Sequence, residues 1–313
     1  MFGFVLRRVL ATIPVMLVVA LVVFLLLHLS PGDPAAIIAG ENATQEDIDR
    51  IRATLGLDRP LVVQFFSWIW DLLRGDLGVS VYNKVAVTTL IAQRMQPTIS
   101  LAVFTMFFAV SLAVPIGVLA AWKVGTWVDH VIMGFAIVAF SCPVFLLGYG
   151  LVFGLARKWK LLPVQGFTPI EQGIGPFLSH LVLPALSLGL VYMALLSRMT
   201  RSTMLEVLGE DYIRTARAKG LNERTVLLRH ALRNASVPIV TTIGLGIALL
   251  IGGVVVTESV FAIPGIGRLT IEAVTQRDYP VIQGVILIAS LVYVLINLGI
   301  DLVYGLLDPR IRI

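Results

Sequence analysis

The sequence contains little charge and almost no cysteine. Asp, Glu, Lys and Arg make up 14% of its 313 residues, against roughly 25% in soluble domains, while 58% are hydrophobic. A soluble fold of this length has too few charges to cover so much apolar surface. The single cysteine excludes an internal disulfide framework, and the high hydrophobicity excludes a disordered chain. The remaining class is an all-α protein that crosses a membrane several times.

The sequence also lacks the motifs of common membrane enzymes and nucleotide-binding proteins. It has no His-Glu-x-x-His zinc pair and no Gly-x-Ser-x-Gly nucleophile turn. Cys142 lies within an apolar stretch, where a cysteine packs as a small hydrophobe. No lysine follows a glycine, as a phosphate-binding loop requires. We therefore predict a chain that is not an enzyme, has no catalytic, metal or cofactor-binding residues, and does not itself bind ATP.

Six apolar stretches free of Asp, Glu, Lys and Arg are long enough, or nearly so, to cross the ~30 Å hydrocarbon core as helices. They are residues 9–27, 99–122, 131–156, 181–197, 235–257 and 281–300. Pro115, Pro143 and Pro184 fall inside three of them and predict kinks. An even number of spans places both termini on the same side of the membrane.

The basic residues predict which side that is. Arg7 and Arg8 precede the first span, and segment 198–234 is rich in Arg and Lys. Because basic loops remain in the cytoplasm, both termini are predicted to be cytoplasmic. The net charge of +5 then reflects topology, and no basic run interleaved with aromatic residues indicates nucleic-acid binding.

The extracytoplasmic segment 28–98 is predicted to contain two helices. Thr44 and Asp47 have the spacing of a capping box before a helix that ends near Leu55, and Gly56 follows as its C-cap. A second helix over 61–73 is rich in aromatic residues. It lies in the headgroup region or packs on the outer ends of the spans, and docking of an outside partner is a further possibility.

Segment 198–234 is predicted to form two short helices around Gly220. Acidic residues begin the first helix and basic residues end it, which suits the helix dipole. Asn222 caps the second, whose apolar face contains Leu228, Ala231 and Leu232. From the residues alone, two interpretations stay open: a thin helix that enters a groove on another protein, or a hairpin that supports the bundle. The first helix and its flanks contain Glu210, Asp211, Tyr212, Arg214, Ala216, Arg217, Ala218, Lys219 and Gly220.

This segment resembles the cytoplasmic EAA loop of permease subunits in binding-protein-dependent ABC importers. Alignment on Gly220 matches Ala216 and Leu232, whereas His230 and Arg233 depart from the general pattern. The departures are similar to the version found in dipeptide and oligopeptide permeases. The resemblance extends over the chain through Pro31-Gly-Asp-Pro, Leu55-Gly-Leu-Asp-Arg-Pro, Gly75-Asp-Leu-Gly-Val-Ser, Pro264-Gly-Ile-Gly-Arg, Arg277-Asp-Tyr-Pro and Asp308-Pro-Arg-Ile-Arg.

The resemblance implies a fold with six transmembrane helices of the type I importer class in the bacterial cytoplasmic membrane. Residues 1–95 would form the first span and the extracytoplasmic segment, and residues 96–313 a five-helix core whose loop 198–234 contacts an ATPase. The implied partners are a homologous second permease subunit, two cytoplasmic ATPase subunits that use ATP and Mg, and an extracytoplasmic substrate-binding protein. The implied cargo is a di- or oligopeptide.

Two alternatives to peptide import by an ATP-driven complex remain. Permeases for glutathione and nickel share much of this pattern. A self-sufficient secondary transporter commonly has ionisable residues in mid-membrane, but Glu258 and Asp301 lie at span ends here, so no proton relay is evident.

Overall fold

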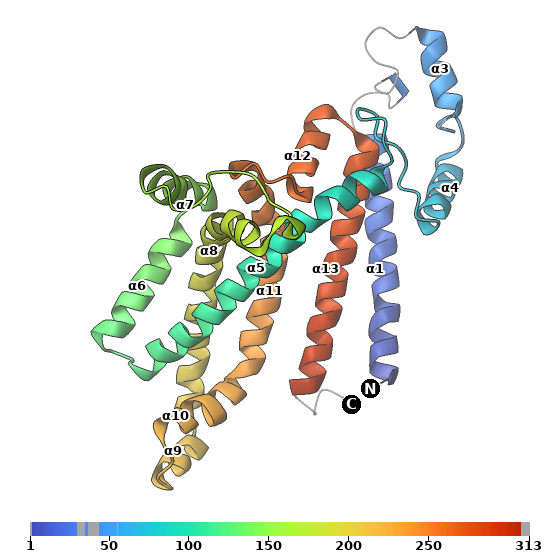
Figure 1. Ribbon diagram of the computed structural model, residues 1–313. Helices are drawn as coiled ribbons and strands as arrows, with labels where there is room; N and C mark the ends of the chain where they lie inside the picture. The colour runs from blue at the N-terminus through green and yellow to red at the C-terminus, as the bar shows by residue number, and fades with distance from the viewer. Residues whose placement is uncertain (1, 30–34, 37–43, 55, 308–313) are drawn as a thin grey trace. The chain divides into compact units, whose positions relative to one another are not determined.

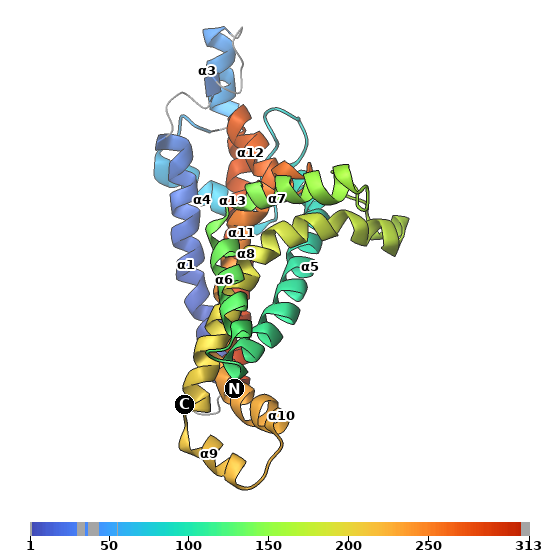
Figure 2. The same ribbon diagram turned by 90° about the vertical axis from the view of Figure 1, so that its left-hand side faces the viewer.

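The computed structural model describes residues 2–29, 35–36, 44–54 and 56–307, which form helices joined by turns and loops (Figure 1, Figure 2). One isolated β-bridge, between Val79 and Ala86, lies among these residues. The Pro31-Gly-Asp-Pro and Asp308-Pro-Arg-Ile-Arg motifs lie outside the described residues.

Four helices contain segments long and apolar enough to cross a membrane on their own. They are α1 (Phe2–Leu29), α5 (Val87–Trp122), α8 (Ile174–Leu208) and α13 (Tyr279–Leu307). Two bent helix pairs, over residues 127–158 and 223–260, bring the number to six if each pair is one span. The predicted all-α membrane fold is confirmed, and six spans is the upper count among the described residues.

The third predicted span, 131–156, is bent, and the kink predicted at Pro143 is confirmed. It consists of α6 (Trp127–Ser141) and α7 (Val144–Leu151), which continues into a π-helical turn, η1 (Val152–Lys158). The two parts meet at an angle of 104°. Cys142 has extended backbone angles because the ring of Pro143 disfavours a helical residue before it, and α6 therefore ends there.

Prolines 115 and 184 do not end their helices. α5 and α8 continue through them, as helices in membranes can when neighbouring groups satisfy the freed carbonyls. α8 also extends to Leu208, eleven residues beyond the predicted end of the fourth span at 197.

The chain forms two compact units. One contains residues 1–95 and 269–295, and the other contains residues 96–268 and 296–313. The predicted division also falls after residue 95, but the structure groups 269–295 with the N-terminal part, and the two predicted domains remain a prediction.

The first unit contains α1, α3 (Gln45–Thr54) and α4 (Leu61–Leu73). Both predicted helices of segment 28–98 are confirmed, and Gly56 has the expected positive φ of 66° after α3. The side chain of Asp47 and all of Leu55 lie outside the described residues, so the capping box stays a prediction. α12 (Ile266–Gln276), which begins just before this unit, was missed by the sequence analysis.

α8 is the central helix of the second unit, in contact with α6, α7 and α11 (Leu232–Val260). Small residues allow these helices to approach closely. A Cβ on Gly246 of α11 would overlap with the ring of Tyr192 on α8, whose hydroxyl donates to the carbonyl of Ile243 over 2.9 Å.

Candidate functional site

The loop that joins α8 to α11 projects beyond the ends of both helices (Figure 1, Figure 2). It begins at Gly209 and contains α9 (Asp211–Ala218) and α10 (Glu223–Thr225). α10 continues through a π-helical turn, η3 (Val226–Ala231), into α11. The predicted pair of helices around a glycine is confirmed, but the second is the beginning of a long helix.

α9 has one buried face. Ile213 is fully buried and Ala216 is 7% exposed, within an apolar cluster that includes Met204 of α8 and Leu227 of η3. Ala216 therefore anchors α9 to its own chain, whereas Ala218 faces outward. The exposed members of the predicted set are Glu210, Asp211, Tyr212, Arg214, Arg217, Ala218, Lys219 and Gly220.

A Schellman turn at Gly220 ends α9. The N–H of Gly220 donates to the carbonyl of Arg217 over 2.9 Å, and the N–H of Leu221 donates to that of Ala216 over 3.3 Å. Gly220 has a φ of +77°, which an L-residue rarely adopts. Gly220, the glycine predicted between the two helices, is thus the left-handed C-cap residue of the first.

The second helix begins with the predicted cap, because the side-chain oxygen of Asn222 accepts a hydrogen bond from the N–H of Arg224 over 3.1 Å. Its predicted apolar face is partly wrong. Ala231 is fully buried, but Leu228 is 60% exposed. The wider π-helical turn rotates the side chains relative to α-helical spacing, so that Leu227 is buried in place of Leu228.

Two polar contacts tie α9 to the second helix. Arg217 forms a bidentate pair with Glu223, with Nη2–Oε1 at 2.8 Å and Nε–Oε2 at 3.3 Å. The side-chain amide of Asn234 donates to the hydroxyl of Tyr212 over 2.6 Å. Glu223 and Asn234 were not among the predicted residues, because nothing in their spacing marks them as partners of α9.

The outer surface of α9 presents both signs of charge. Arg214 pairs with Asp211 one turn earlier at 3.2 Å, an exposed contact of little energetic weight. Lys219, by contrast, has no salt-bridge partner in the part of the chain that the structure describes. The arrangement suits contact with another protein.

A bidentate ion pair joins α6 to the last part of α8. Arg201 Nε lies 2.6 Å from Asp129 Oδ1, and Nη2 lies 2.7 Å from Oδ2. The N–H of Gly125 also donates to this carboxylate, over 3.0 Å. The side chain of Asp129 is 5% exposed. Sequence reasoning missed the pair, since 72 residues separate its members.

A second buried carboxylate, that of Glu258, is held where α11 ends. It accepts from the hydroxyl of Thr98 and from the N–H of Arg268, the latter over 2.9 Å. A Cβ on Gly265 would overlap with the carboxylate, so the Pro264-Gly-Ile-Gly-Arg motif lets the chain wrap around it. From the sequence, Glu258 was predicted only to lie at a span end.

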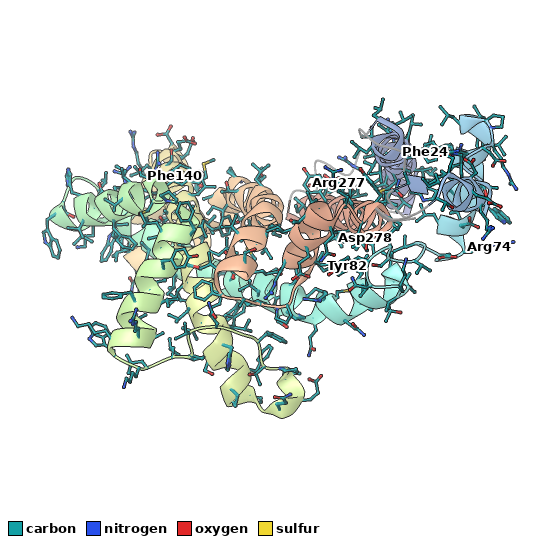
Figure 3. The ribbon with its side chains drawn as sticks, turned by 90° about the horizontal axis from the view of Figure 1, so that it is seen from above. Phe24, Arg74, Tyr82, Phe140, Arg277 and Asp278 are labelled. Atoms are coloured by element: carbon teal, nitrogen blue, oxygen red, sulfur yellow. The ribbon has the colours of Figure 1, made fainter. Side chains whose placement is uncertain are left out.

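In the first unit, Asp278 organises the loop that precedes α5. Its carboxylate accepts from the hydroxyl of Ser80 and from the N–H groups of Val81 and Tyr82, at 3.1 and 3.3 Å. Figure 3 shows Tyr82, Arg277 and Asp278 near one another. Arg277 has a φ of 55°, which turns the chain between α12 and α13 and brings Asp278 to the loop.

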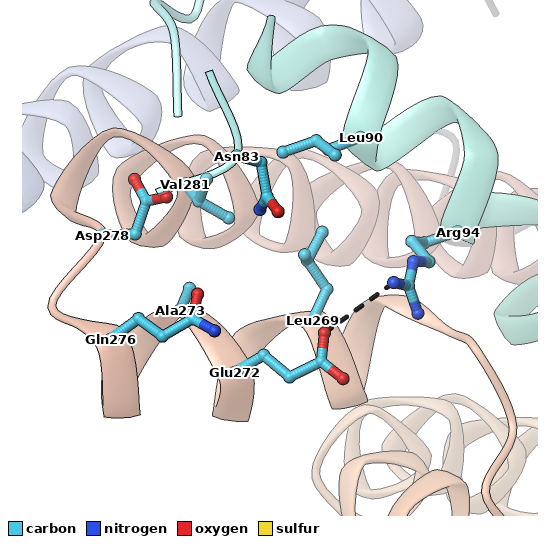
Figure 4. A pocket seen from close by; sticks show the side chains of 9 residues that line it. All are labelled: Asn83, Leu90, Arg94, Leu269, Glu272, Ala273, Gln276, Asp278 and Val281. Atoms are coloured by element: carbon cyan, nitrogen blue, oxygen red, sulfur yellow. Dashed lines mark ion pairs between the residues drawn. The ribbon is translucent and has the colours of Figure 1, made fainter. Parts of the chain in front are cut away.

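The same loop borders a polar cavity of about 80 Å³ (Figure 4). Arg94 of α5 and Glu272 of α12 line it and lie 3.8 Å apart. Ligand pockets usually have volumes of ~300–1,000 Å³, so this cavity suits a few water molecules and not a peptide. Its other lining residues are Asn83, Leu90, Leu269, Ala273, Gln276, Asp278 and Val281.

Comparison with known proteins shows extensive similarity. The chain is 52% identical to a probable peptide ABC transporter permease, y4tP, of Sinorhizobium fredii, over 99% of both chains. It is 42% identical to the dipeptide transport system permease DppB of Escherichia coli K12, over 100% of this chain and 99% of that one. Among solved structures, an inward-facing MetNI methionine ABC transporter matches its fold, with a TM-score of 0.56 and 16% identity over 70% of this chain and 96% of the other.

Two family models cover nearly the whole sequence. Residues 113–313 match the inner membrane component of binding-protein-dependent transport systems, and residues 1–102 match the N-terminal part of such membrane components. The matched regions contain the α8–α11 loop and the apolar helices described above. The chain therefore belongs to the family of binding-protein-dependent transport system inner membrane components.

Proposed function

We propose that this chain is a permease subunit through which an ATP-driven complex imports di- or oligopeptides. The proposal rests on its family and on the full-length similarity to relatives named as peptide and dipeptide permeases. ATP hydrolysis would take place on two separate ATPase subunits. A homologous second permease and an extracytoplasmic binding protein would complete the importer.

We further propose that α9 is the contact through which an ATPase moves this subunit. This proposal rests on the contacts that attach α9 to the neighbouring helices. Its buried face, with Ile213 and Ala216, packs on α8 and η3, and its polar contacts reach Glu223 and Asn234 on the second helix. A push on the exposed face is therefore transmitted to two membrane helices without deforming α9.

This role requires both chain ends and the α9 loop to lie in the cytoplasm, an orientation that the basic residues favour. A reporter active only in the cytoplasm should work when fused after Ile313 or within 202–208. It should fail within residues 40–60, and activity there would overturn the orientation.

Crosslinking tests the contact with the ATPase. In a Cys142→Ala background, Ala218→Cys on the exposed face of α9 should crosslink to an ATPase subunit in the assembled complex. Ala53→Cys, an exposed alanine of α3, is the matched control and should not. A crosslink at Ala53 and none at Ala218 would refute the assignment.

Uptake in the reconstituted complex tests the cargo. Radiolabelled di- and tripeptides, glutathione and nickel are supplied in turn with the binding protein, and ATP-dependent accumulation is measured for each. Accumulation of peptides supports the proposal. Accumulation of glutathione or nickel alone would keep the importer class and refute the peptide assignment.

A further inference from the structure

The short helix α4 of the first unit has three distinct faces. One face is half-buried and contains Phe65, Trp68, Ile69 and Leu72. A polar stripe contains Gln64, Ser67 and Asp71. The third face is apolar and exposed, with Val62 67%, Phe66 65%, Trp70 56% and Leu73 75% accessible. These spacings of three and four residues are those of neighbours on one side of a helix.

The half-buried face packs against α1, in an apolar cluster that also includes residues of α13. The ring of Phe24 on α1 meets that of Phe65 edge-on at 5.3 Å and that of Trp68 at 5.8 Å. Trp68, Ile69 and Leu72 also join a cluster that contains Val19, Ala20, Val23, Ile286 and Leu287. Figure 3, which looks along α1, labels Phe24 on this helix.

The position of these contacts along α1 sets the depth of α4. The apolar segment of α1 is 7–26, so its middle lies between residues 16 and 17. At 1.5 Å per residue, Val19 and Phe24 lie about 4 and 11 Å from the middle. Since half of the hydrocarbon core is ~15 Å thick, both lie inside it, on the side away from the N-terminus.

α13 gives a consistent depth. Its apolar segment is 279–302, and Leu287 lies about 5 Å from the middle of that segment. The contacts with α1 and the α13 residues of the same cluster thus place the half-buried face of α4 within the membrane, although segment 28–98 was predicted to be extracytoplasmic. Tilt of the helices would only decrease these distances from the midplane.

The ends of α4 suit such a position, because backbone groups in hydrocarbon must be satisfied internally. The amide of Gln64 donates to the carbonyls of Leu57 and Arg59, at 3.2 and 2.7 Å. At the other end, the N–H groups of Gly75 and Asp76 donate to carbonyls of the last turn, each over 3.0 Å. The guanidinium of Arg74, the residue directly after α4, lies 4.8 Å from the centre of the Trp70 ring.

We propose that α4 is immersed in the half of the bilayer distal to the N-terminus, with Val62, Phe66, Trp70 and Leu73 in contact with lipid acyl chains. Exposure of such a contiguous apolar surface to water is unfavourable. The neighbouring α1 supports lipid as the occupant, because only 17% of its apolar segment is buried and most of its side chains face outward as well. α4 and α1 then present one continuous surface to the membrane.

Site-directed spin labelling tests this proposal in the complete importer, reconstituted in lipid. In a Cys142→Ala background, Phe66→Cys labels the proposed lipid face and Ser67→Cys labels the polar stripe one residue away. Val22→Cys on the exposed side of α1 and Tyr82→Cys on the loop before α5 serve as lipid and water standards. Collision rates with oxygen, which concentrates in lipid, and with a water-soluble nickel chelate are measured at each label.

The ratio of the oxygen collision rate to the nickel-chelate collision rate should be the same for the Phe66→Cys label as for the Val22→Cys label. The Ser67→Cys label should have a lower ratio. A ratio at Phe66 like that at Tyr82 would mean that the face is in water and would overturn the proposal. Low rates with both reagents at Phe66 would mean that a protein covers the face, and would overturn it too. Full uptake by the Phe66 variant shows that the labelled complex is assembled.

Discussion

Replacing Gly220 with valine should uncouple ATP hydrolysis from transport. The φ of +77° lies in the left-handed region, which costs an L-residue about 1–2 kcal/mol and a β-branched residue more. Among the described residues, no atom outside Gly220 and its two chain neighbours lies within 4 Å of where a Cβ would stand, so the cost comes from the backbone and not from a clash. A penalty of this size decreases the ratio of the native turn to its opened form by roughly 5–30-fold.

The turn holds the angle between α9 and the second helix. If it opens, the hydrogen bond from Leu221 to Ala216 and the Arg217–Glu223 pair across the turn are both lost. The change affects no membrane helix, so insertion and the ATPase activity of the isolated ATPase subunits should be unchanged. Uptake per ATP hydrolysed should decrease by up to the same roughly 5–30-fold factor.

The assay measures ATP hydrolysis and peptide uptake together in the reconstituted complex. Gly220→Asn is the matched control, since asparagine tolerates the left-handed conformation better than other residues with a Cβ. The expected order of coupling is glycine, asparagine, alanine and then valine. Equal loss in the asparagine and valine variants would point to a blocked contact surface instead of strain. Wild-type uptake per ATP in the valine variant would refute the coupling role.

Three further predictions concern contacts outside this turn. Arg217→Glu should weaken the α9 hairpin by up to about 1 kcal/mol, and adding Glu223→Arg should restore peptide uptake. If either charge instead bound a partner subunit, the double substitution would not restore uptake. Asp129→Asn leaves a partly buried guanidinium without its carboxylate and should cost about 3 kcal/mol, measured as a lower Tm of the purified complex. Gly265→Ala should lower the yield of folded protein, because its methyl group would overlap with a buried carboxylate, whereas Gly150→Ala, with open space around its Cβ position, should not.

The local features of the loop could be predicted from the sequence because each depends on neighbouring residues. Gly220 and Asn222 have roles in ending and starting helices that follow from their own backbone preferences. The helix over 61–73 was likewise predicted with its observed bounds. The family resemblance in turn came from short motifs spread over the chain, and the family models confirm it.

Other features could not be predicted because they depend on the geometry of a turn or on distant partners. The exposure of Leu228 follows from a π-helical turn, which hydrophobic spacing does not reveal. The chain bends at Pro143, whereas α8 continues through Pro184. Whether a proline interrupts a helix depends on whether neighbouring groups satisfy the freed carbonyls. The Asp129–Arg201 pair joins two helices far apart in the sequence.

The way in which α9 is attached suggests the direction in which it acts. Both polar contacts of α9 with other helices, Tyr212–Asn234 and Arg217–Glu223, reach the helix that becomes α11. The link to α8 is a short turn at Gly209 and Glu210, together with apolar contact near Met204. Apolar contacts can slide, whereas bidentate pairs fix an orientation. In the proposed role, a displacement of α9 would therefore rotate the start of α11 more than the end of α8, and η3, with its wider turn, is where that rotation would enter the membrane helix.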